Sequence, residues 1–318
     1  MHVHVFACRP FALACARFGA LALAVLGCAP ALSATSASAA GNGVIAVVPT
    51  WEECEYYGLD RQVPPARAAD GELICSDRTR GIVVVAADGS GARRLPLPLD
   101  KAYRQVGFSG DGRYLSWNDD RGYYLSTWFG TRTRRIAGCG GGCWAAWSPV
   151  GAAIVFNQGN SLVRVDVNSG RRRKLAVGGR ALWSRGATLI AYLRGKRVMR
   201  MRPDGSSARM LTRLPSGVRG ATPDGWSEDG HCLLIEAYNE NTERDRRYAV
   251  DLQTGRTRLA KAPRRGGVIS PDGRLRAFGR TSGVYVSRRD GSARRQLLGA
   301  PASWNAKWYE VQAWQPLP

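Results

Sequence analysis

Histidine and acidic side chains are scarce in this sequence, and their scarcity limits the chemistry that the chain can perform. The 318 residues include three histidines, and 25 Asp and Glu stand against 46 Lys and Arg. Beyond the first forty residues the one histidine is His231. Nucleophilic triads need a histidine beside Ser or Cys, and no G-x-S-x-G elbow occurs. Paired carboxylates such as Glu52-Glu53 and Asp119-Asp120 are sequence neighbours with no pattern that makes them converge. We therefore expect no catalytic residues.

The first forty residues lack an apolar run long enough to span a bilayer, because Phe18 to Leu26 is too short. Arg9 and Arg17 accompany this run, and small residues follow it as far as Ala40. This is the pattern of a secretory signal. We assign residues 1–40 to a signal peptide and Ala/Ser-rich linker, and residues 41–318 to one folded domain.

A second interpretation of the leader rests on Val25-Leu26-Gly27-Cys28, which resembles a bacterial lipoprotein box. The exported protein is then either secreted or periplasmic, or held at the cell surface by lipid on Cys28. Both interpretations stay open from the sequence.

Cysteine is sparse after the leader and its spacing suits an oxidising compartment. We predict the disulfides Cys54–Cys75 and Cys139–Cys143, with Cys232 a buried free thiol in an apolar run. Zinc at Cys139 and Cys143 would need two further ligands, and no second Cys pair or His cluster supplies them. No Asp-x-Asp-x-Asp-Gly calcium loop occurs either. We expect no metal and no cofactor.

One segment, Val268 to Leu298, shows the architecture most clearly. The apolar lead-in Gly-Val-Ile-Ser is followed by three β-prone runs, separated by turns at Pro271-Asp272-Gly273 and Asp290-Gly291. Asp-Gly between alternating apolar residues is a strong hairpin signal, because Gly accepts positive φ without steric cost. The segment predicts a four-stranded antiparallel meander, which needs neighbours to bury its faces.

The same segment recurs along the chain. An apolar or aromatic residue followed by Ser, or by Gln in the last copy, marks each repeat, at steps of 39, 36, 43, 43 and 45 residues. The marker residues are Phe108, Trp147, Trp183, Trp226, Ile269 and Trp314. A period of roughly 40 residues with four strands per unit is typical of a β-propeller. We interpret the aromatic marker as packing between blades.

The count of repeats predicts an all-β, six-bladed propeller of four-stranded antiparallel blades. Its first repeat, residues 72–97, consists of Glu-Leu-Ile-Cys and two following strands and lacks an inner strand. The segment around Trp314 would supply that strand, so that the C-terminal strand closes the ring. Val44–Val48 competes with that segment for the same inner position.

These repeats resemble the WD40-like repeats of the TolB family, in which W-S-P-D-G, two strands, D-G-S and R-x-L-T follow one another. Residues 268–298 match almost throughout, and Pro203-Asp204-Gly205 with Met210-Leu211-Thr212 matches the second half. The resemblance spans most of residues 72–316. It implies a non-catalytic scaffold that contacts partner proteins in the cell envelope, although propellers host many unrelated activities.

The excess of basic residues suggests anionic partners, but the position of many of them has a simpler explanation. Arginines cluster on the expected fourth strand of each repeat, for example at Arg93-Arg94, Arg171 to Lys174 and Arg294-Arg295. That strand is the outer edge of a blade, where charge blocks edge-to-edge association. We expect a monomer whose partner is a protein or peptide, with anionic polymer or lipid headgroups as further possibilities and nucleic acid not expected.

The binding residues are expected on the face that carries the irregular connections, because function concentrates in loops on a rigid scaffold. The candidates lie in the links that precede the inner strands: Arg104, Trp144, Arg180, Arg219, Arg264, Arg265, Lys307 and Trp308. The alternative is a hydrolase or lyase of envelope glycans with a sialidase-like arginine and carboxylate site. Its S-x-D-x-G-x-x-W box is missing, since Ser109-Gly110-Asp111-Gly112 has the wrong spacing.

Overall fold

The computed structural model describes residues 41–57, 72–79, 81–97, 104–119, 121–138, 144–227, 229–260, 267–299 and 308–317. For Gly41, residues 51–57, residues 72–78 and Trp308 it describes the backbone alone. The leader with Cys28, the pair Cys139 and Cys143, and the candidates Arg264, Arg265 and Lys307 lie outside these residues. No helix among the residues described is long and apolar enough to cross a membrane.

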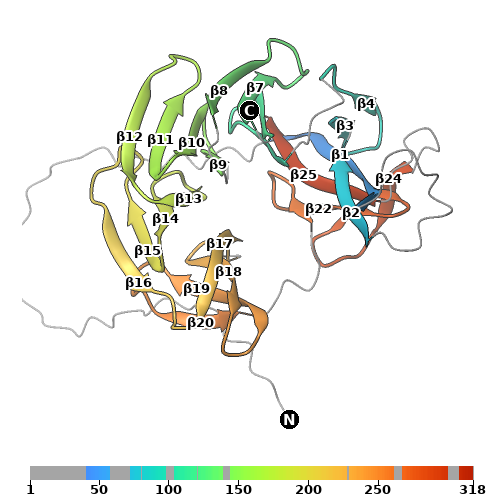
Figure 1. Ribbon diagram of the computed structural model, residues 1–318. Helices are drawn as coiled ribbons and strands as arrows, with labels where there is room; N and C mark the ends of the chain where they lie inside the picture. The colour runs from blue at the N-terminus through green and yellow to red at the C-terminus, as the bar shows by residue number, and fades with distance from the viewer. Residues whose placement is uncertain are drawn as a thin grey trace, which may run out of the picture.

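The chain forms six antiparallel sheets arranged as the blades of a propeller, which we name A to F (Figure 1). Blade A has the order β25 (Trp308–Leu317), β1 (Gly41–Tyr57), β3 (Val83–Ala86) and β4 (Arg93–Arg94). Blade B consists of β5 (Arg104–Phe108), β6 (Tyr114–Asn118), β7 (Gly122–Thr127) and β8 (Arg134–Gly138). Blade C consists of β9 (Ala145–Trp147), β10 (Ala153–Gln158), β11 (Ser161–Asp166) and β12 (Arg172–Val177).

The other three blades repeat this order from the inner to the outer strand. Blade D consists of β13 (Gly179–Trp183), β14 (Ile190–Arg194), β15 (Arg197–Met201) and β16 (Arg209–Arg213). Blade E consists of β17 (Val218–Trp226), β18 (Cys232–Asn239), β19 (Arg244–Asp251) and β20 (Thr257–Ala260). Blade F consists of β21 (Val268–Ile269), β22 (Leu275–Arg280), β23 (Gly283–Arg288) and β24 (Arg295–Gly299). The six-bladed, all-β prediction is confirmed.

The C-terminal strand completes blade A, as the sequence predicts. β25 pairs antiparallel with β1, with Trp314 opposite Ile45 and Glu310 opposite Val48. Trp314 and Ile45 also pack in one cluster with Ala277 and Val286 of blade F. The two ends of the described chain thus share blade A, between blades B and F.

The second strand of blade A differs from the prediction. The segment Glu-Leu-Ile-Cys, expected to open the first repeat, belongs to β2 (Glu72–Thr79), which pairs with the outer half of β1. The first half of β1 pairs with β3 instead, from Val44 opposite Ala86 to Val47 opposite Val83. Residues 44–48 form the second strand of the blade because both of their faces are buried. Ala46 and Val48 pack toward blade B, and Ile45 and Val47 pack toward blade F.

Side-chain packing between blades makes up the core. The aromatic markers also join blades by hydrogen bonds: the indole N–H of Trp147 donates to Gly107 O at 3.1 Å, and that of Trp183 donates to Ala146 O at 3.1 Å. Each acceptor lies on the inner strand of the preceding blade. Their interpretation as inter-blade packing residues is therefore confirmed.

The Ser-x-Asp-Gly turns are built from local hydrogen bonds. In blade E the Ser227 hydroxyl donates to the Asp229 carboxylate at 2.6 Å, and the backbone N–H of His231 donates to the same oxygen at 3.0 Å. The Ser227 bond lowers the pKa of Asp229; burial opposes this shift and the His231 bond adds to it. Gly230 follows with φ of 74°, which favours glycine.

The basic residues of the outer strands occupy sheet edges, as expected, and some of them also join blades. Arg134 Nη2 donates to Val167 O at 3.4 Å, and Arg172 Nη2 donates to Ile136 O. Arg295 Nη1 donates to Asp88 O at 3.0 Å, from blade F to blade A. Some of the basic side chains therefore donate hydrogen bonds to backbone carbonyl oxygens of the neighbouring blade.

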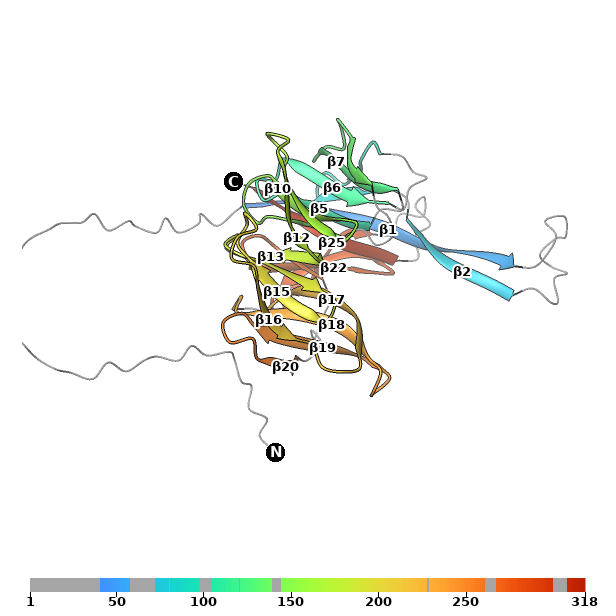
Figure 2. The same ribbon diagram turned by 60° about the vertical axis from the view of Figure 1, so that its left-hand side comes forward.

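β1 and β2 extend beyond blade A as a two-stranded arm, visible on the right of Figure 2. The arm takes the place of the turn between the second and third strands of this blade. In its register Cys54 lies directly opposite Cys75. The backbone therefore suits the predicted disulfide, which stays a prediction.

Candidate functional site

The propeller has two faces with different connections. We call the face with the Ser-x-Asp-Gly turns the turn face. The other, the loop face, carries the turns between second and third strands and the links between blades. Because every blade repeats one strand order, the arm projects from the loop face at blade A.

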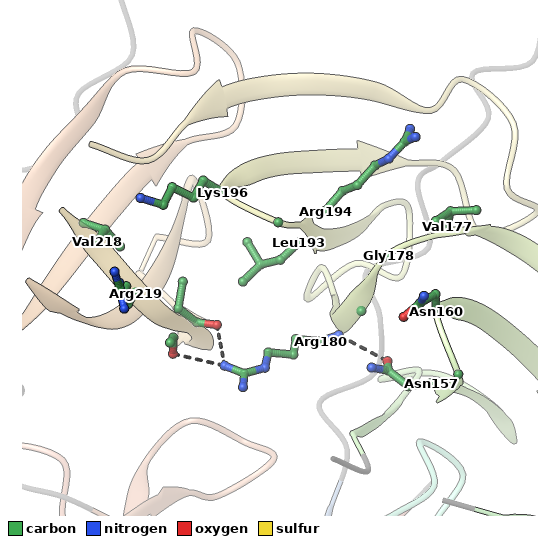
Figure 3. Close-up of a pocket in the computed structure, with 15 residues that line it drawn as sticks. Asn157, Asn160, Val177, Gly178, Arg180, Leu193, Arg194, Lys196, Val218 and Arg219 are labelled. Carbon is green, nitrogen blue, oxygen red and sulfur yellow. Dashed lines mark hydrogen bonds between the residues drawn. The ribbon is translucent and has the colours of Figure 1, made fainter. Parts of the chain in front are cut away.

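A hollow of about 670 Å³, which we call the loop-face pocket, lies where blades C, D and E meet (Figure 3). Its wall combines the β10–β11 turn, the link from β12 to β13, the β14–β15 turn and the start of β17. The lining residues are Asn157, Gly159, Asn160, Val177, Gly178, Gly179, Arg180, Leu193, Arg194, Gly195, Lys196, Val218, Arg219, Gly220 and Ala221. Four of them are cationic and none is acidic.

The link from blade C to blade D is packed tightly against blade D. Gly178 has φ of 149°, and a Cβ there would lie 2.7 Å from the carbonyl oxygen of Leu193. Only glycine allows this approach. The close packing brings Arg180, two residues later, to the pocket wall.

Arg180 holds three blades together beneath the pocket. Its backbone N–H donates to Asn157 Oδ1 at 3.2 Å, and its Nη1 donates to Gly220 O at 3.1 Å and to Ala221 O. Figure 3 shows this side chain spanning the gap toward blade E. Its φ of 53° is unusual for a residue with a Cβ. Arg180 therefore adds charge to the pocket while fixing its shape.

The remaining cations are exposed at the rim. Arg219 is ion-paired with Glu240, whereas Arg194 and Lys196 flank Gly195 in the β14–β15 turn. Within the described chain, neither of these two side chains forms an ion pair. In Figure 3 Lys196 extends toward Val218 and Arg194 extends in the opposite direction. Two cations without an ion pair among the described residues, beside a mainly apolar hollow, favour an anionic group with some apolar surface.

The structure brings together some of the sequence-predicted residues and separates others. Arg180 and Arg219 line the pocket. Trp144 lies elsewhere, because its indole N–H donates to Ala181 O at 3.0 Å in an inter-blade contact. Arg104 is exposed at the start of β5 and does not line the pocket.

Arg194 and Lys196 were not among the sequence-predicted residues. Their signal is the sequence Arg-Gly-Lys in a tight turn on the loop face. The sequence alone does not distinguish this turn from other solvent-exposed turns. Its place in a pocket depends on the start of β17 in blade E, which lies beside it.

The comparisons with known proteins bear on the fold alone. No protein-family model matches the chain, and no curated protein matches its sequence. The crystal structure of TolB from Acinetobacter baumannii matches with a TM-score of 0.50 and 16% identity, over 86% of this chain and 67% of that one. A nidogen/laminin complex matches at 0.49 and 12% identity, over 85% and 100%. The chain has a TolB-like propeller fold.

Proposed function

We propose that this chain is a non-catalytic binding propeller of the cell envelope or extracellular space. As a monomer, it engages an anionic group of a protein or peptide partner at the loop-face pocket. The observation that carries the proposal is a pocket wall with four cations and no carboxylate, in which Arg194 and Lys196 form no ion pair with any residue that the structure describes. The secretory leader in the sequence supports the compartment.

The pocket gives a glycan hydrolase no support. Glycosidases of the two-carboxylate type need a general acid and a second carboxylate on either side of the scissile bond. The pocket wall offers neither, and the nearby Glu240 is paired with Arg219. We expect chromogenic sialosides and aryl glycosides to remain uncleaved by the purified protein.

Charge reversal at the pocket rim tests the binding proposal. The variant Arg194→Glu/Lys196→Glu changes two exposed side chains that hold no blade together. The matched control Arg209→Glu/Arg213→Glu reverses two exposed cations on β16 of the same blade. Arg180 is unsuitable for this test, because its substitution would also remove the hydrogen bonds to Gly220 O and Ala221 O of blade E.

The readout is affinity capture from envelope extract with quantitative mass spectrometry, followed by direct titration of the captured partner. We expect recovery of at least one partner to fall about tenfold or more with the rim variant, as loss of charge-assisted hydrogen bonds implies. The control should capture that partner as the parent protein does. Equal recovery with all three proteins would overturn the proposal.

A further inference from the structure

The contact between blades E and F differs from the other five. Hydrophobic clusters fill the interfaces A/B, B/C, C/D, D/E and F/A. No cluster formed by the described residues contains side chains of both E and F. The ribbons of these two blades also stand further apart than other neighbours in Figure 1.

The sequence of blade F accounts for this difference. The sixth residue after the marker Ser is Leu115, Ile154, Ile190 and Leu233 in blades B to E, and each is fully buried. Blade F has Arg276 at this position. The marker itself is Ile269, which is 40% exposed and has no indole N–H to donate to blade E.

The face of blade F toward blade E carries a groove of about 750 Å³. Residues on the opposite face of the blade, such as Ala277 and Val284, pack against blade A. The groove is lined chiefly by Arg276, Phe278, Arg280, Ser287 and Arg294 of blade F, and β25 of blade A adds Tyr309, Glu310 and Val311 at its inner end. We call it the blade F groove.

Arginine side chains lie against aromatic rings in this groove and beside it. The Phe278 and Tyr285 rings are stacked, with centroids 5.9 Å apart. The guanidinium carbons of Arg276 and Arg280 lie 5.5 and 5.7 Å from the Phe278 centroid, and that of Arg294 lies 5.8 Å from the Tyr285 centroid. These cation–π contacts favour a position of each guanidinium beside its ring before any ligand arrives.

The charge of the groove is only partly balanced. Arg280 and Arg294 are exposed, and no carboxylate of the described chain is ion-paired with either. Glu310 is the one acidic residue among those lining the groove. The site thus presents guanidinium forks, whose geometry suits carboxylates bidentately.

We propose that the blade F groove is a second binding site, which takes an extended acidic peptide segment of a partner protein. Carboxylates of alternate residues would contact Arg280 and Arg294, and apolar atoms of the segment would lie over Phe278. A second copy of this chain is a poor occupant, since each copy carries a net charge of +21. Because both aromatic rings already have stacked neighbours, a sugar ring finds little bare aromatic surface. The site is independent of the loop-face pocket.

The test measures binding of a short fluorescein-labelled peptide of alternating Glu and Gly to the full chain by fluorescence anisotropy. The groove variant is Arg280→Gln/Arg294→Gln. The controls are Arg209→Gln/Arg213→Gln on blade D and the pocket-rim variant Arg194→Gln/Lys196→Gln. Arg280→Lys/Arg294→Lys keeps the charge and removes the forks. Thermal melting verifies that each variant folds.

We expect the groove variant to raise the Kd about tenfold or more, since each bond to a charged group is worth about that factor. The lysine variant should weaken binding in part, and the two controls should change it little. Equal weakening by all the neutralised pairs would reveal unspecific attraction and overturn the proposal. Tighter binding of an oligouronate than of the peptide would also overturn it, in favour of a glycan site. If only the pocket-rim variant fails to bind, the loop-face pocket is the peptide site and the groove proposal is wrong.

Discussion

The indole N–H of Trp226 donates to the backbone carbonyl oxygen of Trp183 at 2.7 Å. The marker side chain of blade E thus holds the strand that carries the marker of blade D, and Trp183 in turn holds Ala146 of blade C. The same contact, an indole N–H bonded to a carbonyl oxygen on the inner strand of the preceding blade, therefore stabilises both the C/D and the D/E interface.

Removing one indole N–H should therefore destabilise the protein measurably. We expect Trp183→Phe to lower the free energy of unfolding by about 1–2 kcal/mol, because Ala146 O loses its indole donor. Trp183→Ala should cost about 3–5 kcal/mol, since it also empties a buried site. Trp128→Phe is the control, because among the described residues no hydrogen bond joins the Trp128 indole to another blade. Urea unfolding followed by tryptophan fluorescence checks all three; equal effects of Trp183→Phe and Trp128→Phe would contradict the prediction.

The closing strand approaches blade F so closely that one glycine is needed. A Cβ on Gly279 would collide with the carbonyl group of Tyr309 in β25. We expect Gly279→Ala to cost about 1–3 kcal/mol, as overpacking does. The control is Gly186→Ala, whose Cβ would meet only Thr188 Cγ2 at 3.9 Å. A thermal melt distinguishes the two, and an unchanged melting temperature for Gly279→Ala would show that the strands can move apart.

The opposed positions of Cys54 and Cys75 make a disulfide testable directly. We expect both thiols of the exported protein to resist alkylation until a reductant is added, as mass spectrometry of the tryptic peptides can show. Loss of the bond in Cys54→Ser/Cys75→Ser should destabilise the arm by about 3 kcal/mol in the chain-entropy description. Protease nicking of the arm reports that change. Alkylation of both thiols without reductant would exclude the bond.

The turn aspartates should make stability depend on acid pH. The pKa values of Asp229 and Asp272 are lowered in the folded chain: the Ser227 bond is the main cause for Asp229, whereas for Asp272 hydrogen bonds from Ser270 and the backbone outweigh burial. A lowered native pKa means that the unfolded chain binds protons first as the pH falls. Their contribution is thus fully present above the unfolded value of about 3.9 and is lost below it.

The measurement is the urea midpoint between neutral pH and pH of about 3. Asp229→Asn/Asp272→Asn should be less stable at neutral pH and lose less on acidification than the parent protein. Asp245→Asn, on an exposed strand end, should follow the parent. An equally steep loss in the double variant would contradict the assignment.

Much of the fold could be predicted because turn chemistry is local. Ser-x-Asp-Gly specifies a tight turn wherever it occurs, and the spacing of the aromatic or apolar marker before Ser predicted the number of blades. The second strand of blade A could not be predicted, since Val44–Val48 and the segment at Leu73 are both apolar runs. Only burial against two neighbouring blades, as for Ile45 and Val48, decides between them.

The candidate site was predictable in part for the same reason. Arg180 and Arg219 lie in links whose face follows from strand order, and they do meet. Trp144 was expected to bind a partner, but its indole N–H is used within the fold. Arg276 and Ile269 show the reverse case: their departure from the repeat was visible in the sequence, yet its meaning depends on which blade stands opposite.

The direction of β1 has a consequence for any attachment to a surface. Its first residues lie on the turn face, where Asn42 accepts a hydrogen bond from the backbone of Asp272, in the blade F turn. The strand then crosses the blade and leaves it as the arm on the far side (Figure 2). A tether preceding Gly41 would therefore hold the molecule by its turn face. The arm and the Arg194 rim would then face the surrounding medium.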